Sequence, residues 1–133
     1  MTNKPTVLFV CHHNANRSQI AAGYLEHFAG NRIRVLSAGP QPAPHLNPAA
    51  VQAMSEDGID IASAQPRALT DQTVETADVV ITLGCPDACP AQPGKRYEEW
   101  TLTGGGDGIE AARTIRDQIK QRVHVLADDL LAR

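Results

Sequence analysis

The sequence lacks the features that would direct its 133 residues to a membrane or to a nucleic acid. No apolar run approaches the roughly 20 residues that span a bilayer, and residues 1–6 lack the charged and apolar regions of a signal peptide. The formal net charge is −3, and no run of lysine and arginine is long enough to follow a nucleic-acid backbone or an anionic membrane surface. We therefore expect a cytoplasmic protein that binds a small substrate, with no membrane and no nucleic acid as a partner.

Cysteine and aromatic residues are scarce. The three cysteines, an odd number, argue against a framework of structural disulfides in a reducing compartment and leave catalysis, metal binding or burial as their roles. Phe, Trp and Tyr together make up only 4% of the chain. Apolar residues, in contrast, reach 42%, which is enough to bury the core of one ordinary domain. We expect a single domain over residues 1–133.

The distribution of apolar residues predicts alternating strands and helices. Strands are expected at residues 6–10, 33–37 and 78–83, with a weaker edge strand at 95–100. Helices are expected to begin near Ser18, Asn47, Thr70 and Ile109, and the first two to end at Gly30 and Gly58. This alternation is typical of an α/β fold, in which helices cover both faces of a parallel sheet.

The carboxyl ends of parallel strands are where ligands bind in such folds. Cys11 and Cys85 each follow a predicted strand, so we expect both cysteines at the same edge of the sheet. That edge is the expected location of the chemistry.

The segment after the first predicted strand carries the strongest functional signal. Residues 11–18 read Cys-His-His-Asn-Ala-Asn-Arg-Ser, and a wrap of this length aims successive backbone N–H groups at a common centre, where the next helix adds its positive dipole. Arg17 would close this anion cradle with a planar guanidinium, and the same donors would stabilise Cys11 as a nucleophilic thiolate. A chance Cys-x5-Arg match around a buried thiol is the alternative, but the flanking strand and helix favour catalysis.

The other residues of this loop have supporting roles. Ser18 is placed to donate a further hydrogen bond to the cysteine sulfur, and Asn14 and Asn16 suit the left-handed backbone that a tight loop needs. The residues expected to surround the oxyanion are His12, His13, Asn14, Ala15, Asn16 and Arg17.

Residues 7–25, VLFVCHHNANRSQIAAGYL, resemble the nucleophile loop of the low-molecular-weight protein tyrosine phosphatase superfamily, and within it that of the arsenate reductases. The likeness continues in order through Ser37-Ala38-Gly39, Asn47-Pro48, Gly58-Ile59-Asp60, residues 79–83 with Cys85, and residues 93–97 to Trp100. It implies a four-stranded parallel sheet with flanking helices, and transfer of phosphate or arsenate to a cysteine thiolate.

The resemblance also gives the two later cysteines a role. In the thiol-relay reductases that the chain resembles, Cys11 would attack arsenate, and Cys85 would then attack the Cys11 sulfur and release arsenite. Cys89 would move the disulfide to the Cys85–Cys89 pair, which thioredoxin would reduce. Arsenate reduction needs two electrons from thiols, whereas a phosphatase needs only water.

Other interpretations of Cys85 and Cys89 stay open. The two cysteines could be buried inert thiols, or they could be two ligands of a zinc site. In a third interpretation the chain is still a reductase, but external mycothiol or glutathione takes the place of Cys89. A structural zinc site needs four ligands, and the five histidines offer no paired spacing, so we predict no metal. Some relatives hold potassium with a glutamate in the first helix, but Ala22 stands there, and we predict no bound cofactor.

The general acid is missing from its expected place. Members of the family that the chain resembles usually carry Asp-Pro shortly after the tryptophan, and that aspartic acid protonates the leaving oxygen. Here Trp100 is followed by Thr-Leu-Thr-Gly-Gly-Gly-Asp-Gly, so Asp107 is the candidate acid. The equal alternative is that Asp107 is a solvated loop residue or caps the last helix.

Three functions fit the sequence. Arsenate reduction, a reaction of arsenical resistance, is favoured by the cysteines after the third strand. A low-molecular-weight protein tyrosine phosphatase or small phosphomonoester phosphatase is the alternative, although no Phe, Tyr or Trp lies within residues 12–17 or beside Asp107 to wall a phosphotyrosine. A binding or regulatory module that keeps the anion cradle is the third, and only the altered acid loop supports it.

Overall fold

The computed structural model describes residues 4–84, 94–104 and 108–132. Its four strands are β1 (Thr6–Val10), β2 (Arg34–Ala38), β3 (Val79–Thr82) and β4 (Arg96–Glu99). They form one sheet in the order β2-β1-β3-β4, and all three pairings are parallel. All five residues of β1 are buried, as expected for an apolar strand at the centre of a covered sheet. The predicted α/β fold with four parallel strands is confirmed.

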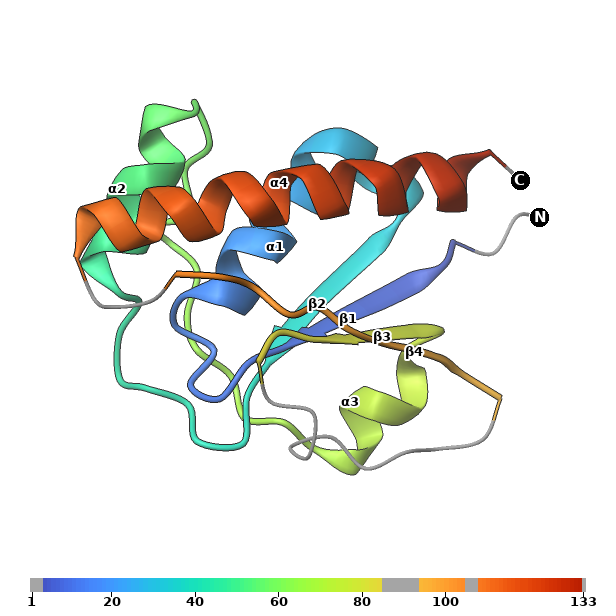
Figure 1. The fold of residues 1–133 in the computed structure, drawn as a ribbon. Helices are drawn as coiled ribbons and strands as arrows, with labels where there is room; N and C mark the ends of the chain where they lie inside the picture. The colour runs from blue at the N-terminus through green and yellow to red at the C-terminus, as the bar shows by residue number, and fades with distance from the viewer. Residues whose placement is uncertain (1–3, 85–93, 105–107, 133) are drawn as a thin grey trace.

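Helices cover both faces of this sheet. They are α1 (Arg17–Ala29), followed by the short 3-10 helix η1 (Gly30–Arg32), then α2 (Pro48–Glu56), α3 (Asp71–Thr76) and α4 (Ile109–Leu131). Figure 1 shows α1, α2 and α4 on one side of the sheet and α3 on the other. The observed bounds lie within about two residues of the predicted ones, which is the usual scatter at element ends.

Capping residues explain where two helices begin. The Asn47 Oδ1 atom accepts a hydrogen bond from the Ala49 N–H at 2.9 Å, and Pro48 follows as the first helical residue of α2. The Thr70 Oγ1 atom accepts from the Thr73 N–H at 3.1 Å at the start of α3. Each side chain satisfies one N–H group that has no partner inside its helix, so both predicted caps are confirmed.

The C-terminal helix buries a stripe of apolar side chains against α1 and α2. The buried residues of α4 are Ala112, Ile115, Ile119, Val123, Leu126 and Ala127, at the three- and four-residue spacing of one helix face. Each large side chain in such a stripe contributes about 1.5–3 kcal/mol to folding. The helix therefore closes the core on this side of the sheet.

The carboxyl ends of the central strands lie side by side. The Leu83 N–H, just after β3, donates to the Val10 carbonyl at the end of β1 at 2.8 Å. Cys11 follows β1 directly and Gly84 follows Leu83, so the edge predicted to carry the chemistry is assembled from these two strand ends. None of the helices in the described segments is long and apolar enough to cross a membrane.

Candidate active site

Cys11 lies at the end of β1, where the chain leaves the sheet for the loop that leads into α1. Only 6% of the residue is exposed. Its Sγ atom lies 2.9 Å from the hydroxyl oxygen of Ser18, which is fully buried in the first turn of α1. The sequence predicted this contact between the sulfur and Ser18, and the structure brings the two atoms together.

Asn14 bonds to the same Ser18 hydroxyl. The Nδ2 atom of Asn14 donates to the Ser18 oxygen at 2.6 Å, and the hydroxyl keeps its hydrogen and a second lone pair for the contact with Cys11. A thiolate sulfur can only accept, so the Ser18 hydroxyl is the donor whenever Cys11 is ionised. Asn14 is the one described non-glycine residue with a positive φ, at 52°, as predicted for this position.

The backbone of the loop turns its carbonyl groups outward. The carbonyls of His12, His13 and Ala15 accept hydrogen bonds of 2.9–3.0 Å from the N–H groups of Gln41, Ala43 and Asn47, all on the segment that wraps the loop. In a trans peptide the C=O and the next N–H point in opposite directions, and no described peptide is cis. The N–H groups of residues 13, 14 and 16 therefore point to the inner side of the loop, as an anion cradle requires.

Gly39 permits this close wrapping. A Cβ atom at Gly39 would lie 2.4 Å from the Cys11 carbonyl oxygen and 2.8 Å from that of His12. Both are backbone atoms that cannot rotate away, so no larger residue fits here without moving the loop.

The Arg17 side chain lies at the carboxyl edge of the sheet beside Gly84. A Cβ atom at Gly84 would lie 2.5 Å from the Arg17 Nη1 atom, so the bare α-carbon of Gly84 leaves room for the guanidinium. Across residues 4–84, 94–104 and 108–132, no group accepts a hydrogen bond from Arg17. Its planar set of donors is available for a tetrahedral oxyanion.

Two of the predicted oxyanion-binding side chains shape the outer rim instead of the cradle. The exposed rings of His12 and His13 meet edge to face, with 4.9 Å between centroids. The His12 Nε2 atom bonds to the Gln41 side-chain oxygen at 3.1 Å, and the His13 Nδ1 atom donates to the Gln41 carbonyl at 2.9 Å. These contacts place both side chains on the outside of the loop, where they shape it, while the His13 N–H remains part of the cradle.

The expectation of a left-handed backbone at Asn16 was wrong. Asn16 has φ −137° because it is the N-cap residue of α1, which requires a non-helical conformation with negative φ, and its carbonyl accepts the Ile20 N–H at 2.9 Å. Its side chain does not cap the helix. The Asn16 Oδ1 atom is buried without a hydrogen-bond partner among the described residues.

Gln19 is a supporting residue that the sequence did not single out. It is 4% exposed, and its side-chain amide donates to the Asn14 carbonyl at 3.0 Å, to the Asn14 Oδ1 atom at 3.2 Å and to the Gln65 carbonyl at 3.3 Å. The Arg67 N–H also donates to Asn14 Oδ1 at 2.8 Å. These bonds connect the loop to a segment about 50 residues away in the sequence. The only sign of this in the sequence is that a polar residue, Gln19, stands on the apolar face of α1.

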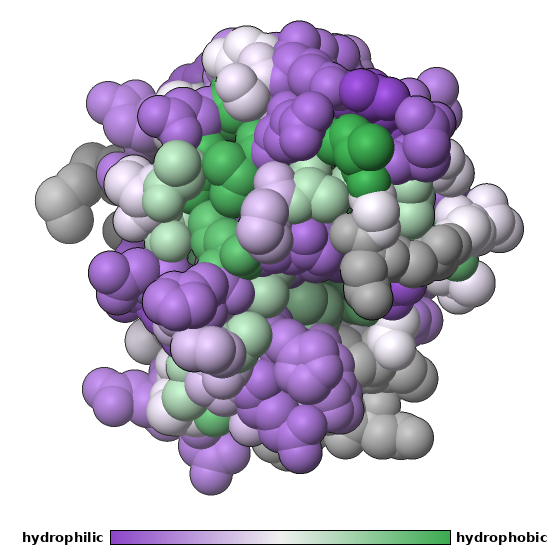
Figure 2. Space-filling model, turned by 90° about the vertical axis from the view of Figure 1, so that its left-hand side faces the viewer, coloured by the Kyte–Doolittle hydropathy of each residue, from purple (hydrophilic) through white to green (hydrophobic). Residues whose placement is uncertain are grey.

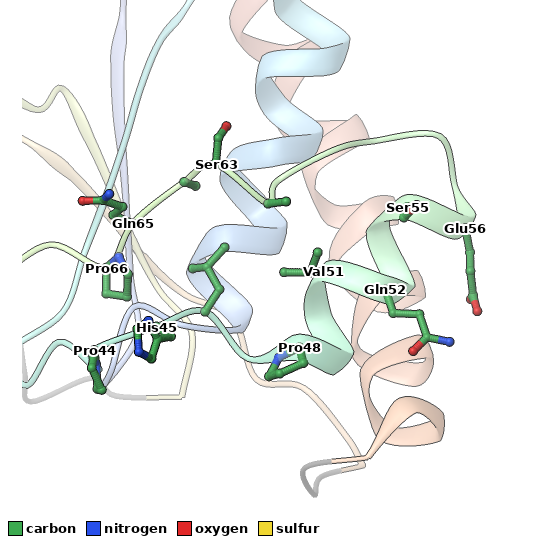
Figure 3. Close-up of a pocket in the computed structure, with 13 residues that line it drawn as sticks. Pro44, His45, Pro48, Val51, Gln52, Ser55, Glu56, Ser63, Gln65 and Pro66 are labelled. Carbon is green, nitrogen blue, oxygen red and sulfur yellow. The ribbon is translucent and has the colours of Figure 1, made fainter.

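A hollow lined by both polar and apolar residues adjoins the loop but does not contain the nucleophile. It lies between α2 and the segments 44–48 and 62–66 (Figure 3), and its apolar lining includes Leu46, Val51 and Pro66. Figure 2 shows hydrophobic residues gathered on this face, with hydrophilic residues around them. Neither Cys11 nor Arg17 lines the hollow, so the chemistry belongs to the loop.

Three residues with predicted roles, Cys85, Cys89 and Asp107, lie outside the described residues. Gly84, the residue that precedes Cys85 in the chain, is described and lies at the same sheet edge as Cys11. Within the described part of the chain, no three His, Cys, Asp or Glu side chains converge in a way that would hold a metal ion. Ala22 is 7% exposed, and its methyl side chain packs in the core.

Comparison with known proteins bears on this geometry. Residues 6–100 match the family model described as low molecular weight phosphotyrosine protein phosphatase. The chain is 34% identical to an arsenate reductase of Halalkalibacterium halodurans, covering 95% of this chain and 97% of that protein. It is 35% identical to a glutaredoxin arsenate reductase of Synechocystis, and the match covers 90% of this chain and 94% of that protein.

A solved structure gives the same picture. The thioredoxin-dependent arsenate reductase of Corynebacterium glutamicum is 42% identical and superposes with a TM-score of 0.87 over 98% of this chain. This chain spans 64% of the length of that one. Similarity of both sequence and backbone therefore extends over nearly all of the residues described above.

Proposed function

We propose, from the premise that the chain belongs to the low molecular weight phosphotyrosine protein phosphatase family, that it reduces arsenate to arsenite. The observation that carries the proposal is the Cys11 sulfur at 2.9 Å from the Ser18 hydroxyl, inside a loop whose N–H groups face inward. Among tetrahedral oxyanions we choose arsenate because the chain is similar to proteins that are named arsenate reductases.

In the first step the oxyanion is held and attacked. The inward N–H groups, the dipole of α1 and the guanidinium of Arg17 bind the negative oxygens. The Cys11 thiolate, stabilised by the Ser18 hydrogen, forms a bond to arsenic as one arsenate oxygen leaves as water. We assign the proton for that oxygen to Asp107, the carboxylate nearest in sequence to the expected acid position.

In the second step the thiols supply two electrons. The Cys85 thiolate attacks the Cys11 sulfur and forms a disulfide, while the electron pair of the broken sulfur–arsenic bond stays on arsenic, which leaves as arsenite. Cys89 then attacks Cys85, so that Cys11 returns as a thiol and the disulfide moves to Cys85–Cys89. Two thiols are oxidised for each arsenic reduced, and the protein needs no bound cofactor.

The reductant that restores Cys85 and Cys89 is an external thiol protein or small thiol. Similar proteins are named for thioredoxin and for glutaredoxin, which favours a dithiol protein of this kind. Mycothiol or glutathione are the alternatives if Cys89 takes no part. All of these act in the cytoplasm, where we place this enzyme as one domain over residues 1–133.

Phosphatase activity is the second candidate, because the same cradle accepts phosphate and the matching family is named for phosphotyrosine phosphatases. The rim of the described loop carries His12 and His13 rather than the aromatic carbon rings that stack on a phosphotyrosine. We therefore expect small phosphomonoesters, rather than phosphotyrosine proteins, to be the substrates of any residual hydrolysis.

The test compares the two activities in one preparation. Arsenate-dependent NADPH oxidation is measured with thioredoxin, glutaredoxin and mycothiol reducing systems, beside hydrolysis of a phosphomonoester. We expect turnover with at least one system, abolished by both Cys11→Ser and Cys85→Ser. Hydrolysis that persists in Cys85→Ser, with no arsenate turnover in the unmodified protein, would instead assign the chain as a phosphatase.

A further inference from the structure

Glu99, the last residue of β4, binds the end of the neighbouring strand through its side chain. It lies opposite Thr82, the last residue of β3, in the parallel register. One carboxylate oxygen accepts the hydroxyl of Thr82, and the other accepts the Gly84 N–H at 3.1 Å. The Trp100 N–H donates to the Thr82 carbonyl at 2.8 Å, so backbone and side chain hold the same point from two sides.

Both oxygens of Glu99 are used on neutral donors, and those donors are two residues apart on one strand end. A single acceptor would fix a distance, whereas two acceptors in a rigid carboxylate also fix the orientation of the backbone. No ion pair among the described residues includes Glu99 or Arg17. The carboxylate therefore holds the strand end without competing with the oxyanion for the guanidinium.

Gly84, which Glu99 holds, is the residue from which the relay segment starts. Gly84 has φ +84°, and it is the residue that precedes Cys85 in the chain. Gly84 also borders Arg17, whose Nη1 atom would lie 2.5 Å from a Cβ at this position. A shift of Gly84 would thus move the origin of the attacking thiol relative to the oxyanion-binding arginine.

We propose that Glu99 is a positioning residue for the thiol-relay step, a proposal that rests on the proposed function. By holding Thr82 and Gly84, it sets the point from which Cys85 reaches the sulfur of Cys11. The step it serves forms the Cys11–Cys85 disulfide, breaks the sulfur–arsenic bond and leaves the electron pair on arsenic, which is released as arsenite. Glu99 itself exchanges no proton and touches no reacting atom.

The test separates this step from oxyanion binding. In a Cys89→Ser background, reduced protein is mixed with arsenate, quenched by alkylation, and the Cys11–Cys85 disulfide is followed by mass spectrometry. Glu99→Ala is expected to slow its formation by about tenfold or more, since small misplacements of reacting groups carry large kinetic costs. Protection of Cys11 from alkylation by inorganic phosphate, which reports binding alone, is expected to stay as in the parent.

Two further variants distinguish positioning from charge and from folding. Glu99→Gln keeps one oxygen that accepts the Gly84 N–H, and its NH₂ group can donate to the Thr82 hydroxyl oxygen. This variant is therefore expected to keep most of the parent rate. Thr82→Val removes one of the two contacts and is expected to slow the reaction less than Glu99→Ala does. Asp128→Ala, which removes an exposed carboxylate of α4 that pairs with His124 and lies away from this sheet edge, is the control and is expected to react at the parent rate.

Three results would overturn the proposal. They are an unchanged disulfide rate in folded Glu99→Ala, a loss of phosphate protection as large as the loss of rate, or a Glu99→Gln variant as slow as Glu99→Ala. Should Glu99→Ala fail to fold, the same decision rests on Glu99→Gln and Thr82→Val. If the parent protein forms neither disulfide nor arsenite, the proposed function itself has failed, which is a different outcome from equal rates in parent and variant.

Discussion

The sheet edge that carries Cys11 and the helical face formed by α1, α2 and α4 treat charge in opposite ways. On the helical face, the Asp57 carboxylate accepts the Tyr24 hydroxyl at 2.7 Å and pairs with Lys120 at 2.8 Å. Glu56 pairs with Arg113 at 2.7 Å and with Arg116 at 3.1 Å. At the sheet edge, the Arg17 guanidinium has no such partner within the described parts of the chain.

The pKa shifts follow the same division. Hydrogen bonds from Lys120 and then Tyr24 hold the pKa of Asp57 below its ordinary value, and the hydrogen bond from Arg113 does the same for the pKa of Glu56. Burial, together with the bond to Asp57, raises the pKa of Tyr24 well above its ordinary value. The helical face thus pairs its charges internally, whereas at the sheet edge the Asn14 and Gln19 amides and the Glu99 carboxylate bind neutral groups, and Arg17 has no ion-pair partner among the described residues.

The largest effect is expected from removing an arginine on each side of this comparison. Arg17→Ala should lower kcat/KM for arsenate by about 10³-fold, because a donor aimed at the reacting oxyanion is lost. Arg116→Ala should leave turnover unchanged and lower the free energy of unfolding by about 1 kcal/mol, since its bonds to Ala53 and Glu56 only join helices. Steady-state kinetics measure the loss of activity, and urea unfolding measures the loss of stability. Equal losses of activity in the two variants would contradict the contrast between the sheet edge and the helical face.

A pair of glycines gives the next largest contrast. Gly39→Ala places a methyl group 2.4 Å from the Cys11 carbonyl oxygen and should lower turnover by about 10²-fold by displacing the loop. Gly58→Ala meets no atom within 4 Å but has φ +79°, so it should cost only about 1–2 kcal/mol of backbone strain. Both variants are assayed for turnover and unfolding. An active Gly39→Ala enzyme would show that the close wrapping of the loop is dispensable.

The smallest effect is a pH dependence confined to the helical face. Because the pKa of Asp57 is lowered by folding, its contribution to stability is present above the ordinary value of 3.8 and is lost as the pH falls through and below that value. The partly exposed Asp57 should contribute about 1 kcal/mol or less. Urea unfolding near neutral pH and near pH 3 should therefore show a smaller loss in Asp57→Asn than in the parent; equal losses would exclude this contribution.

Much of the fold and of the loop could be predicted from the sequence because local rules determine it. Apolar runs predicted the strands, and Asn47 and Thr70 predicted two helix starts, since a capping side chain acts within three residues of itself. The Cys11–Ser18 contact follows from the same locality: one residue ends a strand and the other lies in the next helical turn. Asn14 at positive φ is likewise a property of residue type in a tight loop.

The parts that could not be predicted depend on residues far apart in the sequence. The support of Asn14 comes from Arg67, 53 positions away, and Glu99 binds Gly84 across a gap of 15. Such contacts are set by the strand register and by the path of the segment after α2, and residue type alone determines neither. Asn16 was mispredicted for a related reason: its residue type allowed two conformations, and the start of α1 at Arg17 selected the capping one.

The most direct test of arsenate reduction is a single turnover without an external reductant. Reduced protein is mixed with excess arsenate, the arsenic species are separated by chromatography, and the thiols are counted by mass spectrometry. The account predicts one equivalent of arsenite per protein together with one new disulfide, and neither product in Cys11→Ser. Arsenate recovered unchanged by a folded, fully reduced protein would contradict it.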